Sequence, residues 1–281
     1  MSGAYLLITP SFLFIIIFLF ALWTLFVFSF RESLGMGQIK PGFTFLQYAR
    51  FFKDPHYLGY LTKSLWLTTL STLICILFGY PTAYVMVRKG KWFRQLITIF
   101  LVINLFSMYV VRVYSLMVVL GNNGIIVRSL NFLDVIQTPI KLMYNEIGVI
   151  IGLFIGSVPF MVFPICSALD NVTEDQVEAA LSLGANRIKT FFAVTFPLSL
   201  PGVASGILLS FSWSLSSYVA PALLGGGFSE MMANFIYDQA IGLLNFPMAS
   251  ASAFILLFIT IFIIFLINKV FGHFIRGIVV K

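Results

Sequence analysis

Six long apolar runs constrain the fold of this 281-residue chain more than any other feature. They occupy residues 5–30, 61–87, 95–120, 147–169, 201–225 and 248–270. A helix needs about 20 predominantly apolar residues to cross a bilayer, and each run is long enough. Because lipid offers no partner for the backbone N–H and C=O groups, such runs cross as helices. The sequence therefore predicts an all-α polytopic membrane protein with six transmembrane helices and a single domain over residues 1–281.

The overall composition excludes an ordinary soluble protein. Hydrophobic residues make up 60% of the chain, charged residues 10%, and the mean hydropathy is +1.01. The formal charge of +7 does not indicate nucleic-acid binding, because the basic residues flank apolar runs, where they contact lipid headgroups. Cys75 and Cys166 lie inside apolar runs, which argues against a disulfide or a metal site. The first run lacks signal-peptide features, so we expect it to be retained.

The distribution of basic residues predicts the orientation. The loop at residues 88–94 carries four basic residues and no acid, so it is expected in the cytoplasm. With six spans, both termini and the loop at residues 170–200 then lie on the same side. The loop after the first run also carries four basic residues, but long loops cross largely regardless of charge.

The loop at residues 170–200 contains signals for a short, rigid helix. Thr173 can cap it, with Gln176 three residues on as the partner in a capping box. Acidic residues in the first turns suit the positive end of a helix, and Gly184 supplies a left-handed stop. Two prolines, Pro197 and Pro201, follow before the next apolar run. The pattern indicates an element that contacts a partner at the membrane surface.

The spacing within this loop resembles the EAA loop of ABC importer permeases. Here Glu178-Ala179-Ala180, three residues, Gly184, nine residues and Val194-Thr195-Phe196-Pro197 follow one another. The family pattern is EAA, three residues, Gly, nine residues and Ile-x-Leu-Pro, so Val194 and Phe196 are mild departures. An interfacial helix that carries Glu-Ala-Ala by chance is the alternative interpretation.

The resemblance implies a type I ABC importer permease fold in the inner membrane of a bacterium. It also implies a complex of two permease subunits, two ATPase subunits and an external solute-binding protein. The residues that would couple to the ATPase are Glu178, Ala179, Ala180, Gly184 and Pro197. The sequence contains no phosphate-binding loop and no nucleophile motif, so we expect a non-catalytic subunit without a cofactor. ATP and Mg²⁺ would be used by the partner ATPase.

A second resemblance points to a branch of that family. Arg112-Val113-Tyr114, the Gly121-Asn122-Asn123-Gly124 segment and the Pro159-Phe160 pair are similar to the spermidine/putrescine permeases. Arg112 is also the clearest ionisable residue at membrane depth, where such groups are costly and often functional. Its side chain either faces the translocation path or snorkels to the outer interface.

The fifth run carries a polar stripe. On a helix, Ser210, Ser214, Ser217 and Tyr218 would share one face. Small hydroxyl residues either pack helices together or line a translocation path. Trp213 and Tyr218 offer aromatic faces that can bind a cation. The predicted path residues are Arg112, Tyr114, Trp213, Ser214, Ser217 and Tyr218.

The absence of acidic residues from the six runs bears on the solute. Glu146, at the outer mouth of the fourth run, comes closest. A polycation would be helped by buried carboxylates, so either a second, different permease subunit supplies them or the solute is an opine, an amino-acid derivative or an aminoalkylphosphonate. The competing function is a stand-alone ion-coupled transporter or channel, but matching halves and intramembrane carboxylates, typical of that class, are not seen in the sequence.

Overall fold

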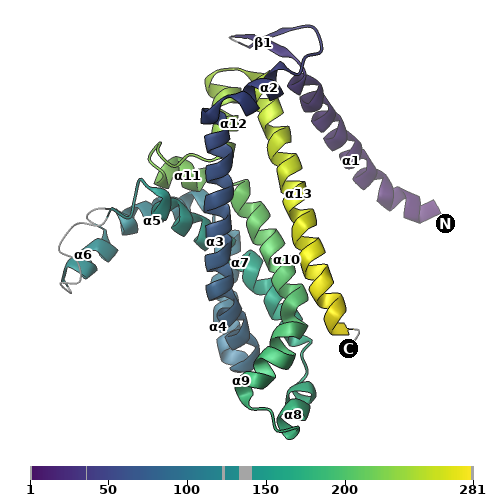
Figure 1. Ribbon diagram of the computed structural model, residues 1–281, viewed down its shortest axis with the longest axis vertical. Coiled ribbons are helices and arrows are strands. Elements are labelled where there is room, and N and C mark those ends of the chain that lie inside the picture. Colours follow the sequence, from purple (N-terminus) through teal and green to yellow (C-terminus); the bar gives the residue numbers. More distant parts are fainter. Residues whose placement is uncertain (1, 36, 122–123, 133–140, 280–281) are drawn as a thin grey trace. The chain divides into compact units, whose positions relative to one another are not determined.

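The computed structural model describes residues 2–35, 37–121, 124–132 and 141–279, and this part of the chain is almost entirely helical (Figure 1). Two strands pair as an antiparallel hairpin, β1 (Glu32–Gly35) and β2 (Gln38–Lys40). The α-helices are α1 (Ser2–Ser29), α2 (Leu46–Lys53), α3 (Pro55–Arg88), α4 (Lys91–Phe106), α5 (Tyr109–Leu120), α6 (Ile125–Phe132), α7 (Glu146–Asp170), α8 (Glu174–Ser182), α9 (Arg187–Thr190), α10 (Phe196–Leu215), α11 (Val219–Leu224), α12 (Met232–Tyr237) and α13 (Phe246–Val279). Two π-helical turns, Phe191–Thr195 and Asp238–Gly242, complete the described elements.

Five helical segments of the described chain are long and apolar enough to cross a membrane, and the number is six when one bent pair of helices is counted as a single span. The five are Phe12–Ser29, Pro55–Arg88, Glu146–Asp170, Arg187–Leu215 and Phe246–Gly272. The sixth is α4 together with α5. The prediction of an all-helical membrane protein with six spans is confirmed, but two of the six expected boundaries need correction.

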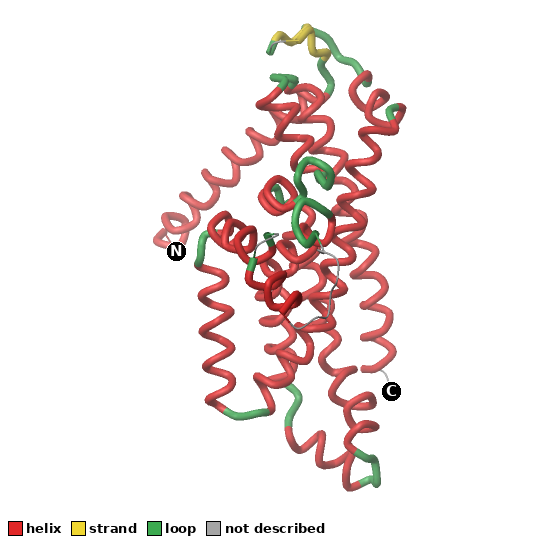
Figure 2. The backbone as a smooth tube through the Cα atoms, turned by 90° about the vertical axis from the view of Figure 1, so that its left-hand side faces the viewer, coloured by secondary structure: helices red, strands yellow, loops and turns green. Residues whose placement is uncertain are grey.

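The third apolar run is not one straight helix. It bends by 106° between α4 and α5, where Ser107 and Met108 have extended backbone (Figure 2). Polar side chains satisfy groups at the break: the Ser107 hydroxyl donates to the Asn104 carbonyl at 3.3 Å, and the Asn104 amide donates to the Ile155 carbonyl at 3.0 Å. The expectation of a continuous span over residues 95–120 is therefore wrong.

The fifth span begins earlier and ends earlier than residues 201–225. Helix runs without interruption from Arg187, passes through the π turn, and continues in α10 to Leu215. The Phe196 N–H donates to the Phe191 carbonyl, five residues back, and Pro197, which has no N–H to donate, directly follows this π turn. Ser217 and Tyr218 lie beyond α10, so the expected polar stripe on one helix face stops at Ser214.

The chain divides into two compact units. The first comprises residues Met1–Leu61 and Met232–Ile259, and the second comprises Thr62–Met231 and Thr260–Lys281. In the first unit, aromatic rings at the end of α1 gather against the segment after the hairpin: Phe30 stacks on Phe43 with centroids 4.6 Å apart and meets Phe45 edge-on at 5.3 Å. Only 6% of the Phe12–Ser29 segment is buried, as expected for a surface that faces lipid or another subunit.

The second unit is held together by close packing of α7 and α10, with α3 beside them. Small residues let the helices approach: a Cβ built on Gly202 would lie 2.5 Å from the Pro164 carbonyl oxygen. Cys75 Sγ of α3 lies 2.9 Å from the Ser157 hydroxyl of α7, and the Ser210 hydroxyl of α10 donates to the Ser157 carbonyl at 3.3 Å. Small and hydroxyl residues at membrane-helix interfaces favour such contacts.

Candidate functional site

The candidate site is the segment at residues 170–200, from the last residue of α7 to the first turns of α10, which we call the EAA loop. Its helix α8 forms as the sequence predicts. A capping box joins Thr173 and Gln176, whose side chain accepts the Thr173 N–H at 3.2 Å. At the other end Gly184 has φ +83°, and the Ala185 N–H donates to the Ala180 carbonyl, five residues back. This is the Schellman arrangement that a left-handed glycine permits.

The outer surface of the EAA loop is open. No residue of α8 is buried, and its acidic side chains Glu174, Asp175 and Glu178 are exposed. Three large apolar side chains next to it are exposed as well: Leu183 by 88%, Ile188 by 71% and Phe192 by 65%. Exposed apolar side chains rimmed by charge are typical of a surface that binds another protein.

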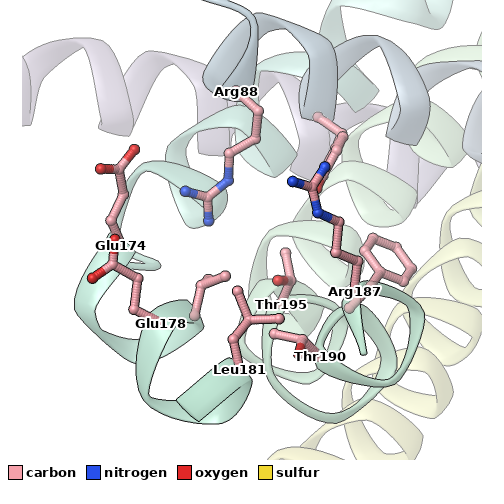
Figure 3. Close-up of a pocket in the computed structure, with 10 residues that line it drawn as sticks. Arg88, Glu174, Glu178, Leu181, Arg187, Thr190 and Thr195 are labelled. Carbon is pink, nitrogen blue, oxygen red and sulfur yellow. The ribbon is translucent and has the colours of Figure 1, made fainter. Parts of the chain in front are cut away.

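A cavity of about 370 Å³ lies between α8 and the rest of the second unit. Figure 3 shows Arg88 and Arg187 reaching into it, with Glu174 and Glu178 on the α8 side. The ion pairs found among the described residues do not join these two arginines to these two glutamates. Apolar and hydroxyl side chains complete the lining: Tyr84, Val177, Leu181, Thr190, Phe191 and Thr195. Glu178 thus borders the cavity while it remains exposed on α8.

The first residues of the EAA loop are held by two arginines on either side of the turn between α3 and α4. Arg94 binds Asp170 with both terminal nitrogens of its guanidinium: Nη1 donates to Oδ1 at 3.0 Å and Nη2 to Oδ2 at 2.6 Å. Arg88 Nη2 donates to the Val172 carbonyl at 3.3 Å. Two of the four basic residues that predict the orientation of the chain, Arg88 and Arg94, therefore also fix the start of the EAA loop.

The last residues of the EAA loop are attached to α3. The Tyr80 and Ser199 hydroxyls lie 3.0 Å apart. The Phe191 ring meets the Tyr80 ring edge-on at 5.9 Å and the Tyr84 ring at 5.7 Å. Between these two attachments, α8 and its glycine stop are left exposed.

The predicted path residues are distributed over three environments. Arg112 and Trp213 both contact Tyr109: the guanidinium lies 5.3 Å from the ring centroid, and the indole meets it edge-on at 4.8 Å. Ser214 and Ser217 are buried, whereas Tyr114 is 55% and Tyr218 37% exposed. The role of all six residues in the path stays a prediction. Asn122 and Asn123 lie outside the described residues.

Sequence reasoning missed Asn104 and Tyr109. Arg112 Nη1 donates to the Asn104 side-chain oxygen across the bend between α4 and α5. Asn104 in turn binds the Ile155 carbonyl of α7, and the Tyr109 hydroxyl donates to the Gly152 carbonyl at 3.2 Å. The signal for Asn104 was available, because it is the single asparagine in the run at residues 95–120.

Replacing Arg112 by alanine is expected to lower the maximal rate of solute uptake about tenfold, with the apparent KM for the solute unchanged. The guanidinium binds Asn104 and covers Tyr109, so its loss loosens the bend and leaves a charge-assisted hydrogen bond unmade. A loss of about 1.5–3 kcal/mol is typical of such a bond, and about 1.4 kcal/mol is a factor of ten.

Uptake kinetics in proteoliposomes test this, with Arg128→Ala in α6 as the control, since Arg128 is exposed. A raised apparent KM in addition to the lower rate would show that Arg112 on the path also contacts the solute. Unchanged uptake kinetics would show instead that the Arg112 side chain reaches the outer membrane interface and takes no part in the path.

Residues 75–278 match the family described as "Binding-protein-dependent transport system inner membrane component". The chain belongs to this family, and it is an inner-membrane permease subunit of a binding-protein-dependent ABC transport system.

Among its relatives is the spermidine/putrescine transport system permease protein PotB of Escherichia coli K12, 32% identical over 215 residues, 76% of this chain and 78% of the relative. PotB of Haemophilus influenzae is 32% identical over 223 residues, 78% of each chain.

Solved structures support the fold. A chain of a bacterial ABC transporter that imports the acidic polysaccharide alginate superposes with a TM-score of 0.76 at 15% identity, covering 96% of this chain and 94% of that one. A chain of the MetNI methionine transporter gives 0.56 at 16% identity, covering 79% and 95%. The prediction of an ABC importer permease fold is confirmed.

Proposed function

We propose that the chain is one of two permease subunits of an ATP-driven importer, assembled with two cytoplasmic ATPase subunits and an external solute-binding protein. Both termini and the EAA loop face the cytoplasm. The observation that carries this proposal is the EAA loop itself, with its family spacing intact and α8 exposed between two attachment points. ATP and Mg²⁺ act in the ATPase subunits, and this chain contributes no catalytic residue.

In this function α8 docks into a groove of an ATPase subunit. Glu178 makes a charged contact there, and the exposed Leu183 and Ile188 add apolar area. Ala179 and Ala180 have small side chains that allow close approach to the helix backbone, so that α8 can enter a groove. Gly184 ends the helix without a side chain and holds its exit in the left-handed conformation. Closure of the ATPase dimer then displaces α8 and moves the helices attached to it.

The solute is a polyamine or a related amino-acid-derived compound, and the similarity to PotB supports this class. The apolar spans carry acids only at the ends of α7, Glu146 and Asp170. Both acids are paired, Glu146 with Lys63 at 3.6 Å and Asp170 with Arg94. A polycation therefore needs carboxylates from the other permease subunit, which favours a heterodimer. This chain contributes Arg112, Tyr114, Trp213, Ser214, Ser217 and Tyr218 to the path.

Extraction of the chain from its native membrane in a mild detergent, followed by identification of every bound subunit, tests the assembly. We expect an ATPase and a second six-helix permease to be recovered. Calorimetry on the solute-binding protein of the same system then compares spermidine and putrescine with opines and aminoalkylphosphonates. A monomer or homodimer that transports without an ATPase would establish the stand-alone transporter instead.

A further inference from the structure

The contact between Arg94 and Asp170 joins the start of α4 to the end of α7. Asp170 is the last residue of α7, three positions before Thr173, which caps α8. Arg94 lies in the first turn of α4. Their two parallel hydrogen bonds, at 3.0 and 2.6 Å, fix the direction of the guanidinium plane as well as its distance. A movement at the start of the EAA loop is therefore passed to α4 in both position and orientation.

The exposure of this pair argues against a mainly stabilising role. The Arg94 side chain is 48% exposed and the Asp170 side chain 35%. Ion pairs exposed to this extent usually add little to the stability of a fold, and bidentate pairs are the ones that add most. The pair is bidentate nonetheless, and it is the most direct polar contact between the EAA loop and α4 among the described residues.

At its far end, α4 reaches the bend of 106° that separates it from α5. Asn104, one turn before that bend, binds the Ile155 carbonyl of α7 and accepts from Arg112 of α5. The helix between Arg94 and Asn104 is continuous. A tilt imposed at Arg94 thus arrives at the contact that holds α4 and α5 at 106°. Transmission of this kind needs an element with two arrangements, and the break between α4 and α5, held by side-chain hydrogen bonds at Asn104, is the candidate.

We propose that Arg94 is a positioning residue for coupling: through Asp170 it makes α4 move with the EAA loop, so that displacement of α8 changes the bend between α4 and α5. The proposal rests on the function proposed above, because it assumes that an ATPase displaces α8. Arg88, whose guanidinium donates to the Val172 carbonyl, attaches the end of α3 to the start of the EAA loop as a second contact.

The test uses the complete complex in proteoliposomes, with solute uptake and ATP hydrolysis measured on the same sample. Arg94→Gln is expected to lower uptake at least tenfold while ATP hydrolysis stays within twofold of wild type, because the ATPase still binds α8. The matched control is Lys91→Gln, which removes a basic side chain from the same turn, one that is exposed and carries no described ion pair. Uptake by this variant is expected to remain within twofold.

A charge exchange separates positioning from a general structural defect. Arg94→Asp and Asp170→Arg are each expected to lose uptake, and the double variant is expected to recover at least a third of it, since the pair is restored in reverse. An Arg94→Gln variant that transports like Lys91→Gln, a parallel loss of uptake and ATP hydrolysis, or a double variant without recovery would each overturn the proposal. A wild-type chain that binds no ATPase would instead overturn the proposed function.

Discussion

Reversing the charge of Glu178 is expected to abolish solute uptake while the chain remains folded and in the membrane. Glu178 is exposed on α8 and borders the cavity that contains Arg88 and Arg187. Glu178→Lys therefore adds a third cation beside two arginines and removes the proposed charged contact with the ATPase. Truncating one partner of a buried, hydrogen-bonded charge pair costs about 2–5 kcal/mol, or a factor of at least about 30 in affinity, and docking of α8 in its groove would bury Glu178 in this way. The measurement is ATPase co-purification together with uptake at equal membrane content.

Asp175→Lys provides the matched control, because it changes the charge of the same helix by the same amount. Asp175 lies in the first turn of α8 and does not line the cavity. Its replacement weakens a favourable interaction with the positive end of the helix, which costs about 0.3–1 kcal/mol. We expect reduced but measurable uptake. Equal loss in both variants would show that the net charge of α8 matters, and normal uptake by Glu178→Lys would remove Glu178 from the coupling contact.

The EAA loop could be predicted from the sequence because its determinants are local. The Thr173 and Gln176 capping box and the left-handed Gly184 act within a few residues, so a short segment specifies α8 whatever surrounds it. The positions of most spans followed from hydropathy in the same way. These signals locate the EAA loop in the sequence, but they do not show which contacts attach it to the rest of the chain.

The bend between α4 and α5 could not be predicted in this way. Ser107 and Met108 are compatible with a helix, and no proline or glycine marks the break. What stabilises it is a set of contacts distant in sequence, above all Asn104 with the Ile155 carbonyl. For the same reason the sequence left two roles open for Arg112, whose side chain reaches back across the bend to Asn104. Tertiary contacts, not the local pattern, set this part of the candidate path.

The packing of α7 against α10 predicts the second large effect, at Gly202. A Cβ at this position would lie 2.5 Å from both the Pro164 carbonyl oxygen and the Ala168 Cβ, and 3.1 Å from the Ile165 Cα. Two of these atoms belong to backbone, which cannot rotate away. Gly202→Ala should therefore force the helices apart, and overpacking of this kind costs about 1–3 kcal/mol. At roughly 2–4 °C per kcal/mol for a chain of this size, we expect the Tm of the purified protein to fall by about 2–12 °C.

Gly59→Ala separates this steric effect from the intrinsic preference for helix. Gly59 lies in α3, and a Cβ there would meet nothing within 4 Å. Alanine is better than glycine in a helix by about 1 kcal/mol, so the control should hold or raise the Tm. Because the same preference acts at Gly202, any fall there understates the clash. If both variants melt like the wild type, α7 and α10 have room to separate at Gly202. Their contact would then be too loose to serve as a fixed base for the proposed movement of the EAA loop and α4.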